Sequence, residues 1–257
     1  DEAFMKGPDE HGPLLLVDAG SSRLKWAWWS GGSLQSGGAC AHKASLADAV
    51  AGIPYRVVKR VLIASVLAEP LRRQLLSSLQ ECFGVEPECA ETTPSCCGLV
   101  NGYRDPGQLG VDRWLAMIAA HNQGPRDSVV VDCGTAVTID VVDEQGRHLG
   151  GEIIPGLSAM TSSLMQTTRL IPLEAQTRGL LGHSTAECVA AGIGHAIAAT
   201  IERVADEAPV HTSGGPDVIM TGGDAVLVSP LVRRPTEVRP HLVLEGLAIW
   251  AGQELKG

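Results

Sequence analysis

A carboxylate, a glycine and a hydroxyl occur together twice in this chain, each time directly after an apolar run. The first set, D-A-G-S, begins at Asp18, and the second set, D-C-G-T, begins at Asp132. The glycine lets the backbone come close to a ligand, and the hydroxyl and its backbone N–H can donate hydrogen bonds to an anion. The carboxylate can hold a cation or a water molecule. Each set therefore predicts a turn that binds a phosphate together with its metal ion.

The sequence around each set predicts a β-hairpin. The apolar runs Leu14–Val17 and Val129–Val131 are typical of buried strands, and alternating apolar residues after each turn predict a strand that returns. One such turn alone is weak evidence, because turns favour these residue types anyway. Two copies, one opening each half of the chain, predict a duplicated architecture with a nucleotide in the cleft between the halves.

Side chains next to these turns have two interpretations each. Lys25 can reach a phosphate as a point charge or end a solvated strand, and the adjacent turn favours the phosphate. Trp26 and Trp28 alternate onto one face of their strand, which favours core packing over stacking on a base. Cys133 lies inside the second turn, where a small packed side chain is the favoured interpretation.

A second candidate pair, Asp112 and Arg113, begins a helix predicted to extend to about His121. The preceding stretch, Thr92–Gly107, is irregular, and a loop of that length is often functional. An acid in the first turn can simply complement the helix dipole, by ~0.3–1 kcal/mol. In the functional interpretation Asp112 is a general base for an alcohol that attacks a phosphoryl group, beside a cation that orients an anionic substrate. The position after an irregular loop favours this second interpretation.

The remaining elements predict mixed sheets covered by helices in both halves. Strands are expected over 57–66, 87–90, 149–154, 217–220 and 241–245, and helices over 46–52, 71–82, 157–166, 185–206 and 246–255. Ser184 is expected to cap the long helix, with Glu187 completing a capping box. The glycine pair in T-G-G-D at 221–224 can let adenine or ribose lie against the backbone, or be a simple turn.

Composition limits the class of protein. The chain has 257 residues, 44% of them hydrophobic, and a net charge of −9, which argues against nucleic-acid binding. Apolar runs stay short of the ~20 residues of a membrane span, and no signal peptide is expected. Seven cysteines without a C-x-x-C pair fit reduced thiols in the cytoplasm. We expect a disordered tail or expression remnant over 1–13 and domains over 14–125 and 126–257.

Several motifs in combination resemble the type III pantothenate kinase family, whose relatives include the Bvg accessory factor proteins. These motifs are DAGSSRLK at 18–25, NGY at 101–103, GVDRW at 110–114, DCGTAVTID at 132–140, GGEIIPG at 150–156 and TGGD at 221–224. The resemblance implies a two-lobed, duplicated actin-like ATPase fold of the acetate and sugar kinase superfamily. It implies ATP-dependent phosphorylation of pantothenate to 4′-phosphopantothenate, the first step towards coenzyme A, by a cytoplasmic homodimer.

The resemblance also implies roles for single residues. ATP would be bound by Asp18, Ala19, Gly20, Ser21, Ser22, Arg23, Leu24, Lys25 and Thr135. Pantothenate would be bound by Tyr103, Gly110, Val111, Asp112, Arg113 and Thr185, with Asp112 as the base and Thr185 near a dimer interface. From composition alone, Thr185 is an ordinary first-turn residue. Asp18 would place Mg²⁺ through water, and Asp132 would bind a monovalent cation, K⁺ or NH₄⁺. Ser21 replaces the family's usual Asn, which shortens the reach to a phosphate.

Two other functions compete with this one. Another small-molecule kinase of the superfamily would share the phosphate turns, but the short length and the NGY and GVDRW motifs argue against it. A non-catalytic transcription accessory protein of the same fold would be expected to lose its acidic residues, and the chain keeps them. No nucleic-acid or membrane partner is expected for this protein.

Overall fold

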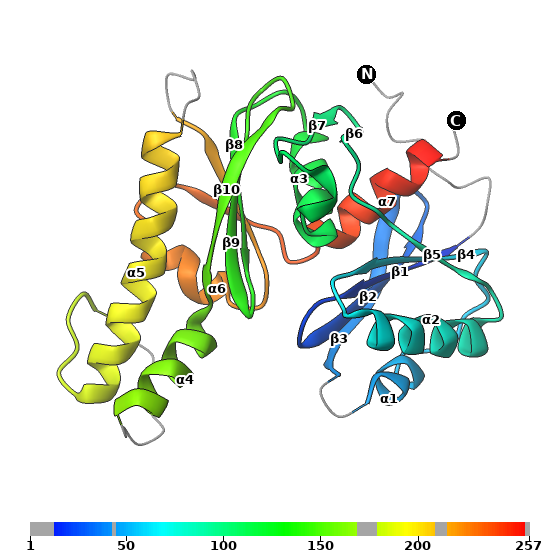
Figure 1. The fold of residues 1–257 in the computed structure, drawn as a ribbon, viewed down its shortest axis with the longest axis horizontal. Coiled ribbons are helices and arrows are strands. Elements are labelled where there is room, and N and C mark those ends of the chain that lie inside the picture. The colour runs from blue at the N-terminus through cyan, green and yellow to red at the C-terminus, as the bar shows by residue number, and fades with distance from the viewer. Residues whose placement is uncertain (1–12, 43–44, 169–178, 209–214, 255–257) are drawn as a thin grey trace. The chain divides into compact units, whose positions relative to one another are not determined.

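The computed structural model describes residues 13–42, 45–168, 179–208 and 215–254, so the tail expected over 1–13 lies almost entirely outside them. The chain forms two compact units (Figure 1). Unit 1 comprises residues 1–123 together with 241–257, and unit 2 comprises 124–240. The sequence analysis assigned 241–257 to the C-terminal domain, whereas the structure packs this segment into unit 1.

Unit 1 is built on a five-stranded sheet with the order β3-β2-β1-β4-β5. Its strands are β1 (Leu14–Ala19), β2 (Arg23–Ser30), β3 (Ser33–Ala41), β4 (Arg60–Ser65) and β5 (Pro87–Cys89). β1 pairs antiparallel with β2 and parallel with β4, which gives the predicted mixed sheet. The expected strand 57–66 is shorter than predicted, because Val57 is exposed and the ladder begins at Arg60.

Helices α1 (Leu46–Ala51) and α2 (Glu69–Phe83) cover one face of this sheet. Ser45 caps α1 by accepting a hydrogen bond from the Asp48 N–H at 3.1 Å. Gly84 ends α2 in the left-handed conformation with φ 68°. Trp28 is fully buried in this core and meets Trp26 edge-on at 5.8 Å between ring centres. The expectation that these tryptophans pack in the core is confirmed.

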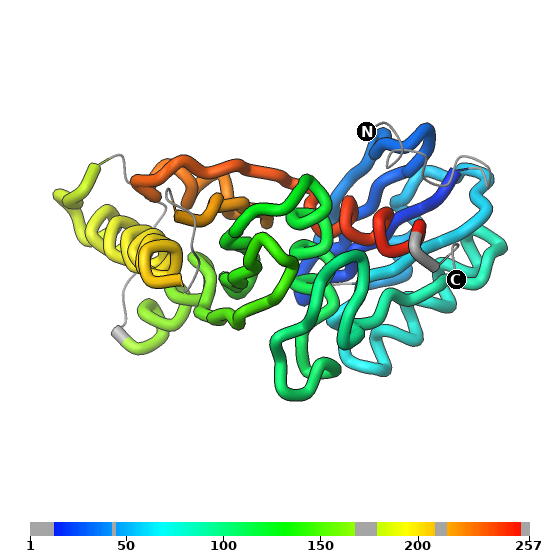
Figure 2. The backbone as a smooth tube through the Cα atoms, turned by 90° about the horizontal axis from the view of Figure 1, so that it is seen from above, coloured from blue at the N-terminus to red at the C-terminus, as the bar shows by residue number. Residues whose placement is uncertain are grey.

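Helices α3 (Val111–His121) and α7 (Leu242–Glu254) pack against each other on unit 1. Figures 1 and 2 show the C-terminal α7 beside the strands from the start of the chain, and α7 contacts both β1 and β4. The predicted strand over 241–245 is wrong, because the helix already begins at Leu242. Gly246 lies so close to the Leu115 backbone that any side chain there would overlap it.

Unit 2 repeats the topology of unit 1, with the strand order β10-β9-β8-β11-β12. Its strands are β8 (Ser128–Cys133), β9 (Ala136–Val142), β10 (His148–Pro155), β11 (Asp217–Thr221) and β12 (Thr236–Val238), and β12 was not predicted. β8 pairs antiparallel with β9 and parallel with β11, as β1 does with its neighbours. The predicted duplication of the architecture is therefore confirmed.

The long helix α5 (Thr185–Glu207) covers the unit 2 sheet together with α6 (Ala225–Val228), and α4 (Leu157–Thr168) packs against α5. Ser184 caps α5 by accepting from the Glu187 N–H at 3.3 Å, as predicted. The Glu187 carboxylate bonds to the N–H of His183, one residue before the cap. The capping box is therefore shifted by one residue.

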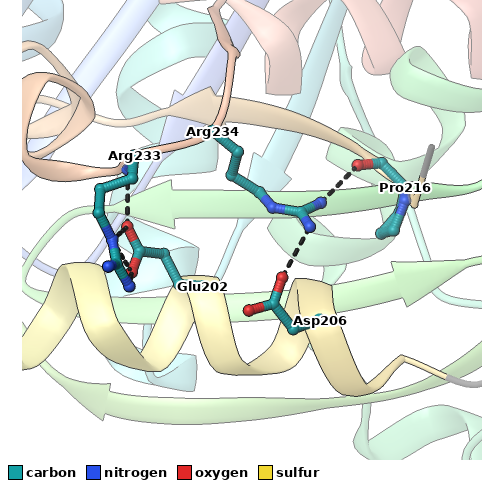
Figure 3. Close-up of polar contacts among 5 residues, drawn as sticks. All are labelled: Glu202, Asp206, Pro216, Arg233 and Arg234. Carbon is teal, nitrogen blue, oxygen red and sulfur yellow. Dashed lines mark hydrogen bonds and ion pairs between the residues drawn. The ribbon is translucent and has the colours of Figure 1, made fainter.

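By length and apolar composition, α5 passes the test for a membrane-spanning helix, although no apolar run of that kind was expected. Its apolar residues Ile197, Ala198 and Ile201 are buried in the core of unit 2, which accounts for the composition. α5 also forms ion pairs with the segment before β12 (Figure 3). Glu202 binds Arg233 through both carboxylate oxygens, and Asp206 binds Arg234 at 2.7 Å.

Candidate functional site

The first phosphate turn follows β1, with Asp18 buried at the strand end. The N–H of Gly20 donates to the carbonyl of Arg23 at 3.1 Å and closes the turn. The carbonyl of Ala19 accepts from the N–H of Val66, just beyond β4, at 3.2 Å. Ser21 and Arg23 are exposed at the tip. The turn therefore exposes the Ser21 hydroxyl to solvent. Backbone hydrogen bonds of Ala19 and Gly20 hold the turn in place.

A histidine that the sequence analysis missed contacts the backbone of this turn. His42 is buried, and its Nε2 lies 2.8 Å from the carbonyl of Gly20. Its backbone N–H donates to the carbonyl of Ser22 at 3.4 Å. His42 lies at the end of β3, far from the motif in sequence, so nothing in the local pattern could have revealed the contact.

Asp18 and Lys25 are cross-strand partners in the β1–β2 ladder. Paired residues share one face of a sheet, and here that face is opposite the core that contains Val17 and Leu24. Lys25 is half-buried rather than a freely solvated strand end. The structure thus brings the predicted carboxylate and the predicted cation together beside the turn.

The second phosphate turn follows β8 and is one residue shorter than the first. The N–H of Gly134 donates to the carbonyl of Ala136 at 3.0 Å, and Thr135 is exposed at the tip. Asp132 is half-buried and pairs with Thr138, so the second hairpin has a hydroxyl where the first has Lys25. The two turns therefore differ both in length and in charge.

Two glycines allow other segments to pack directly on the second turn. A side chain at Gly156 would overlap the carbonyls of Gly134 and Thr135, and the Gly156 N–H donates to Thr135 at 3.0 Å. Gly222 has φ 95°, and a side chain there would overlap Cys133 and the Asp132 carboxylate. The GGEIIPG and TGGD motifs therefore lie against the phosphate turn of unit 2.

Cys133 is fully buried beneath this turn. Burial raises the pKa of its thiol to about 12, and the nearby carboxylates of Asp132 and Asp224 act in the same direction. The thiol therefore stays protonated at neutral pH and is a poor nucleophile. The expectation of a small packed side chain at this position is confirmed.

Oxygen atoms suited to a cation gather at the strand ends of unit 2. The ladders place Asp132, Thr138 and Thr221 on one face, opposite the apolar core. Thr221 is buried, and its hydroxyl has no hydrogen-bond partner within the described residues. One carboxylate with neighbouring hydroxyls fits a monovalent cation. Among the described residues, no group of three or more His, Cys, Asp or Glu could hold a metal ion.

Asp112 lies in the first turn of α3, and its position depends on its two neighbours. Its Oδ1 accepts a hydrogen bond from the Arg113 N–H at 2.8 Å. Gly110 leaves room for the carboxylate, because a Cβ there would lie 2.6 Å from the same oxygen. Asp112 is half-buried at the start of the helix.

Arg113 and Tyr103 are brought together, as the proposed substrate pocket requires. Arg113 is buried and donates to the Tyr103 hydroxyl at 2.7 Å, with its guanidinium 5.5 Å from the ring centre. The alternative interpretation of Arg113 as a solvated face residue is therefore wrong. Asn101 holds Tyr103 in place by accepting from its N–H at 2.9 Å, and the Asn101 amide donates to the carbonyls of Thr93 and Pro106.

The irregular stretch before α3 contains a short hairpin, β6 (Ser95–Cys96) and β7 (Leu99–Val100), and a 3₁₀ helix over Pro106–Gln108. Sequence reasoning found neither of them. Beside this stretch is a cavity of about 460 Å³ at the carboxyl ends of β4 and β5. Its lining includes Ser65, Val66, Arg72, Thr92, Gly110 and Val111.

The cavity connects two parts of the predicted site within unit 1. Val66 lines it and also binds the first phosphate turn, while Gly110 and Val111 line it from the start of α3. Arg72 adds a positive charge, and contact with the Cys89 sulfur raises its pKa further. Parallel strands bind ligands beyond their carboxyl ends. The cavity is therefore a candidate ligand site, with Arg72 and Glu91 of opposite charge in its lining.

Thr185 is exposed at the first position of α5 and belongs to unit 2, unlike the other predicted pantothenate contacts. Thr135 also belongs to unit 2, whereas Asp18–Lys25 belong to unit 1. A substrate contact of Thr185 stays a prediction, as does the predicted cleft between the halves.

Comparison with solved structures identifies the class of fold. The fold matches a Baf family protein from Campylobacter jejuni, with a TM-score of 0.62 and 20% identity over 95% of this chain and 100% of that chain. It also matches MreB 5 of Spiroplasma citri, solved with AMPPNP, with a TM-score of 0.56 and 12% identity over 95% and 97% of the two chains. The chain therefore has the actin-like ATPase fold that the resemblance implied.

Sequence comparison then defines the family. Residues 14–207 match the family described as type III pantothenate kinase. A type III pantothenate kinase of Nitrosococcus oceani is 37% identical over 91% of this chain and 92% of that protein. One of Ectopseudomonas mendocina is 37% identical over 92% and 98%. This chain belongs to the type III pantothenate kinase family.

Proposed function

We propose that this protein transfers the terminal phosphoryl group of ATP to the primary hydroxyl of pantothenate, giving 4′-phosphopantothenate. Membership of the family supports the reaction. The observation that carries the assignment to residues is the start of α3, where Asp112, Arg113 and Tyr103 lie together. This is where a base and a cation are needed for an anionic alcohol.

On the nucleotide side, we assign Asp18–Lys25 and Thr135 to the phosphates of ATP. The backbone N–H groups and hydroxyls of both turns donate to phosphate oxygens, and Lys25 supplies a positive charge. Ser21 is exposed at the tip of the first turn, so its shorter side chain still faces solvent where a ligand can reach it. Anchoring of the turn by His42 and Val66 keeps these donors in place before ATP binds, which lowers the cost of binding.

On the acceptor side, Asp112 accepts the proton of the attacking hydroxyl. Phosphoryl transfer depends mainly on positioning and on electrostatic stabilisation, so a single well-placed carboxylate is sufficient as the base. Arg113 orients the carboxylate of pantothenate, and Tyr103 holds the guanidinium in a fixed direction. Gly110 and Val111 form the wall of the adjoining cavity, and Thr185 makes a further contact with pantothenate.

We assign the cations from the carboxylate and hydroxyl oxygens that lie next to the two turns. Asp132 binds K⁺ or NH₄⁺ with hydroxyls such as that of Thr221 nearby, and this ion offsets phosphate charge. Asp18 orients water molecules of Mg²⁺, which the ATP phosphates bring with them. We further propose a cytoplasmic homodimer with no nucleic-acid or membrane partner. The free state of all cysteines within the described residues fits that compartment.

Release of ADP with and without pantothenate tests the proposal. We expect release that depends on pantothenate, on Mg²⁺ and on K⁺ or NH₄⁺, and that is much slower with Na⁺ alone. A panel of sugars and acetate as acceptors serves as the control for other kinases of the superfamily. Equal turnover with a sugar would identify a different kinase. No turnover with any acceptor would favour the transcription accessory protein.

A further inference from the structure

Two adjacent cysteines lie at the tip of the β6–β7 hairpin, outside the site assigned above. The sulfurs of Cys96 and Cys97 are 3.2 Å apart, and both side chains are half-buried. Neither is in a disulfide. A pair of thiols in contact and within reach of small solutes can react as a unit, which a single surface cysteine cannot.

The hairpin holds this pair in an unusual backbone conformation. Ser95 pairs with Val100 and Cys96 with Leu99, which leaves Cys97 and Gly98 as a two-residue turn. Their φ angles are 53° and 85°, as in the type I′ turn, which strongly favours asparagine followed by glycine. Among the described residues, Cys97 is the only non-glycine residue with positive φ. The fold therefore tolerates a disfavoured conformation at this thiol.

We propose that Cys96 and Cys97 form a reversible redox site that low-molecular-weight disulfides such as glutathione disulfide oxidise to a vicinal disulfide. In the first step a Cys96 thiolate attacks one sulfur of glutathione disulfide, and one glutathione thiolate leaves. In the second step Cys97 loses its proton to solvent and attacks the Cys96 sulfur, and the second glutathione leaves. The protein loses two electrons and two protons, and glutathione disulfide becomes two molecules of glutathione.

The order of attack follows from the contact between the two sulfurs. Hydrogen bonding to the Cys96 sulfur raises the pKa of Cys97, and partial burial adds to the effect. Cys97 therefore holds its proton more tightly than an ordinary cysteine. Since the thiolate is the nucleophile, Cys96 is the residue that attacks the small disulfide and Cys97 is the residue that resolves the mixed disulfide.

Geometry makes the oxidised form labile rather than structural. Neighbouring Cα atoms are about 3.8 Å apart across a trans peptide, whereas disulfides usually join Cα atoms about 4.4–6.8 Å apart. A disulfide between neighbours is therefore strained and is readily reduced by thiols. Reversible disulfides of this kind are the ones that occur in reducing compartments.

The hairpin is coupled to the substrate residues, and this part of the inference rests on the proposed function. The N–H of Asn101, directly after β7, donates to the carbonyl of Pro94 at 2.9 Å, and the Asn101 side chain holds Tyr103. On its other side, the hairpin packs on α3, because a Cβ on Gly98 would lie 3.4 Å from His121 Nε2. A disulfide between Cys96 and Cys97 closes a strained ring, and this ring distorts the turn that lies between these two contacts. Oxidation is therefore expected to loosen Tyr103 and weaken pantothenate binding.

Mass spectrometry of the full-length protein after incubation with glutathione disulfide tests the chemical site. Cleavage after Glu91 and Arg104 isolates a peptide that contains Cys96 and Cys97 and no other cysteine. We expect this peptide to lose two hydrogen atoms in the wild type. In Cys97→Ser, the same peptide should instead carry one glutathione on Cys96. Cys82→Ser, which removes an exposed cysteine, is the matched control and should leave the vicinal disulfide unchanged.

Kinetics of the same samples tests the coupling. Oxidised wild type is expected to show a several-fold higher KM for pantothenate, reversed by dithiothreitol, with no such change in Cys96→Ser. If exposed Cys82 and Cys188 are glutathionylated while the Cys96–Cys97 peptide stays reduced, the redox site is refuted. If the disulfide forms and KM is unchanged, the coupling to Tyr103 is refuted. If the reduced enzyme lacks pantothenate-dependent turnover, the proposed function fails, and the peptide masses still decide the redox site.

Discussion

Asp112 can act as a base only if its carboxylate is held at the start of α3, and two local features hold it there. The Arg113 N–H donates to one oxygen, and the absence of a side chain at Gly110 leaves the space that this oxygen occupies. Both features belong to the GVDRW motif itself. The motif therefore encodes the orientation of the acid as well as its identity.

Asp112→Asn should abolish most turnover while leaving the fold intact. Asparagine can still accept the hydrogen bond from the Arg113 N–H, but it cannot take a proton from the attacking hydroxyl. Loss of general-base assistance is expected to lower kcat ~10²–10⁴-fold, with little change in KM for pantothenate or in melting temperature. Steady-state kinetics and thermal denaturation of the variant measure both quantities. Near-normal kcat would remove Asp112 from the base role.

Gly110→Ala tests the position of the carboxylate rather than its chemistry. The added Cβ would lie 2.6 Å from Asp112 Oδ1, so the flexible carboxylate must move while the helix stays. We expect a fall in kcat of at least ~10-fold, because small displacements of a catalytic group are costly, with a melting temperature close to wild type. Gly107→Ala is the matched control, since its Cβ meets only Asp105 at 3.5 Å. Equal kinetics for the two variants would contradict the argument.

At the scale of single residues, sequence reasoning is strongest where a motif carries the chemistry. It placed Tyr103 and Arg113 in one pocket, and the structure joins them by a hydrogen bond. It missed His42 and the steric role of Gly156, because each acts on a turn that is distant in the sequence. Contacts of that kind depend on the tertiary fold and leave no local pattern.

Among the elements, the short strand β5 is held to β4 by an ion pair that makes the stability of unit 1 depend on pH. Arg60 donates to both carboxylate oxygens of Glu88, at 2.7 and 2.6 Å. These hydrogen bonds lower the pKa of Glu88 below 4.5, against the opposing effect of burial. Because the folded-state pKa is lower than the unfolded one, the contribution to stability is complete above pH 4.5 and is lost as the pH falls through the folded-state pKa.

Glu88→Gln should therefore destabilise the protein at pH 7 and have a vanishing effect in acid. Half-exposed ion pairs contribute at most about 1 kcal/mol, so we expect a loss of that order in the free energy of unfolding at pH 7. The difference from wild type should shrink below pH 4.5. Urea denaturation at several pH values measures it. Glu69→Gln, in an exposed pair with Arg73, is the control, and an equal effect of both variants would refute the special role of Glu88.

Prediction of elements succeeded where a pattern was long and periodic, as in α2, α5 and the two hairpins. It failed only for the start of the last helix, where 241–245 was predicted as a strand, because the run from Leu242 to Trp250 is apolar almost throughout and such runs do not distinguish a buried strand from a buried helix. It also failed for β6, β7 and β12, each of at most three residues. Short strands form because a partner strand is available, and the chain around them shows no alternation.

At the scale of the whole molecule, two units share one topology, but unit 1 is not continuous in the sequence. All of unit 2 lies between the two segments that form unit 1. The first unit is completed by α7, which returns after all of unit 2 to pack on α3. The sequence predicted the duplication from the repeated turns, and nothing in the pattern of α7 shows which unit it joins. The end of the chain thus supports the helix that carries Asp112.

Gly246→Ala tests this support. A methyl group at Gly246 would overlap the backbone of Leu115 in α3, and neither helix backbone can move without disturbing the core. We expect a loss of about 1–3 kcal/mol or more in the free energy of unfolding and a lower kcat, because α3 carries the proposed base. Gly252→Ala in the same helix is the matched control, since a methyl group there meets no atom within 4 Å.

The control should be neutral or stabilising by up to about 1 kcal/mol, because alanine favours the helix over glycine. Thermal denaturation and pantothenate kinetics of both variants decide the matter. Should the two alanines change the melting temperature by the same amount, the contact of Gly246 with α3 would have no special role. Should Gly246→Ala alone lose both stability and turnover, completion of the first unit by the last helix is a condition for catalysis, because the base in α3 then depends on the end of the chain.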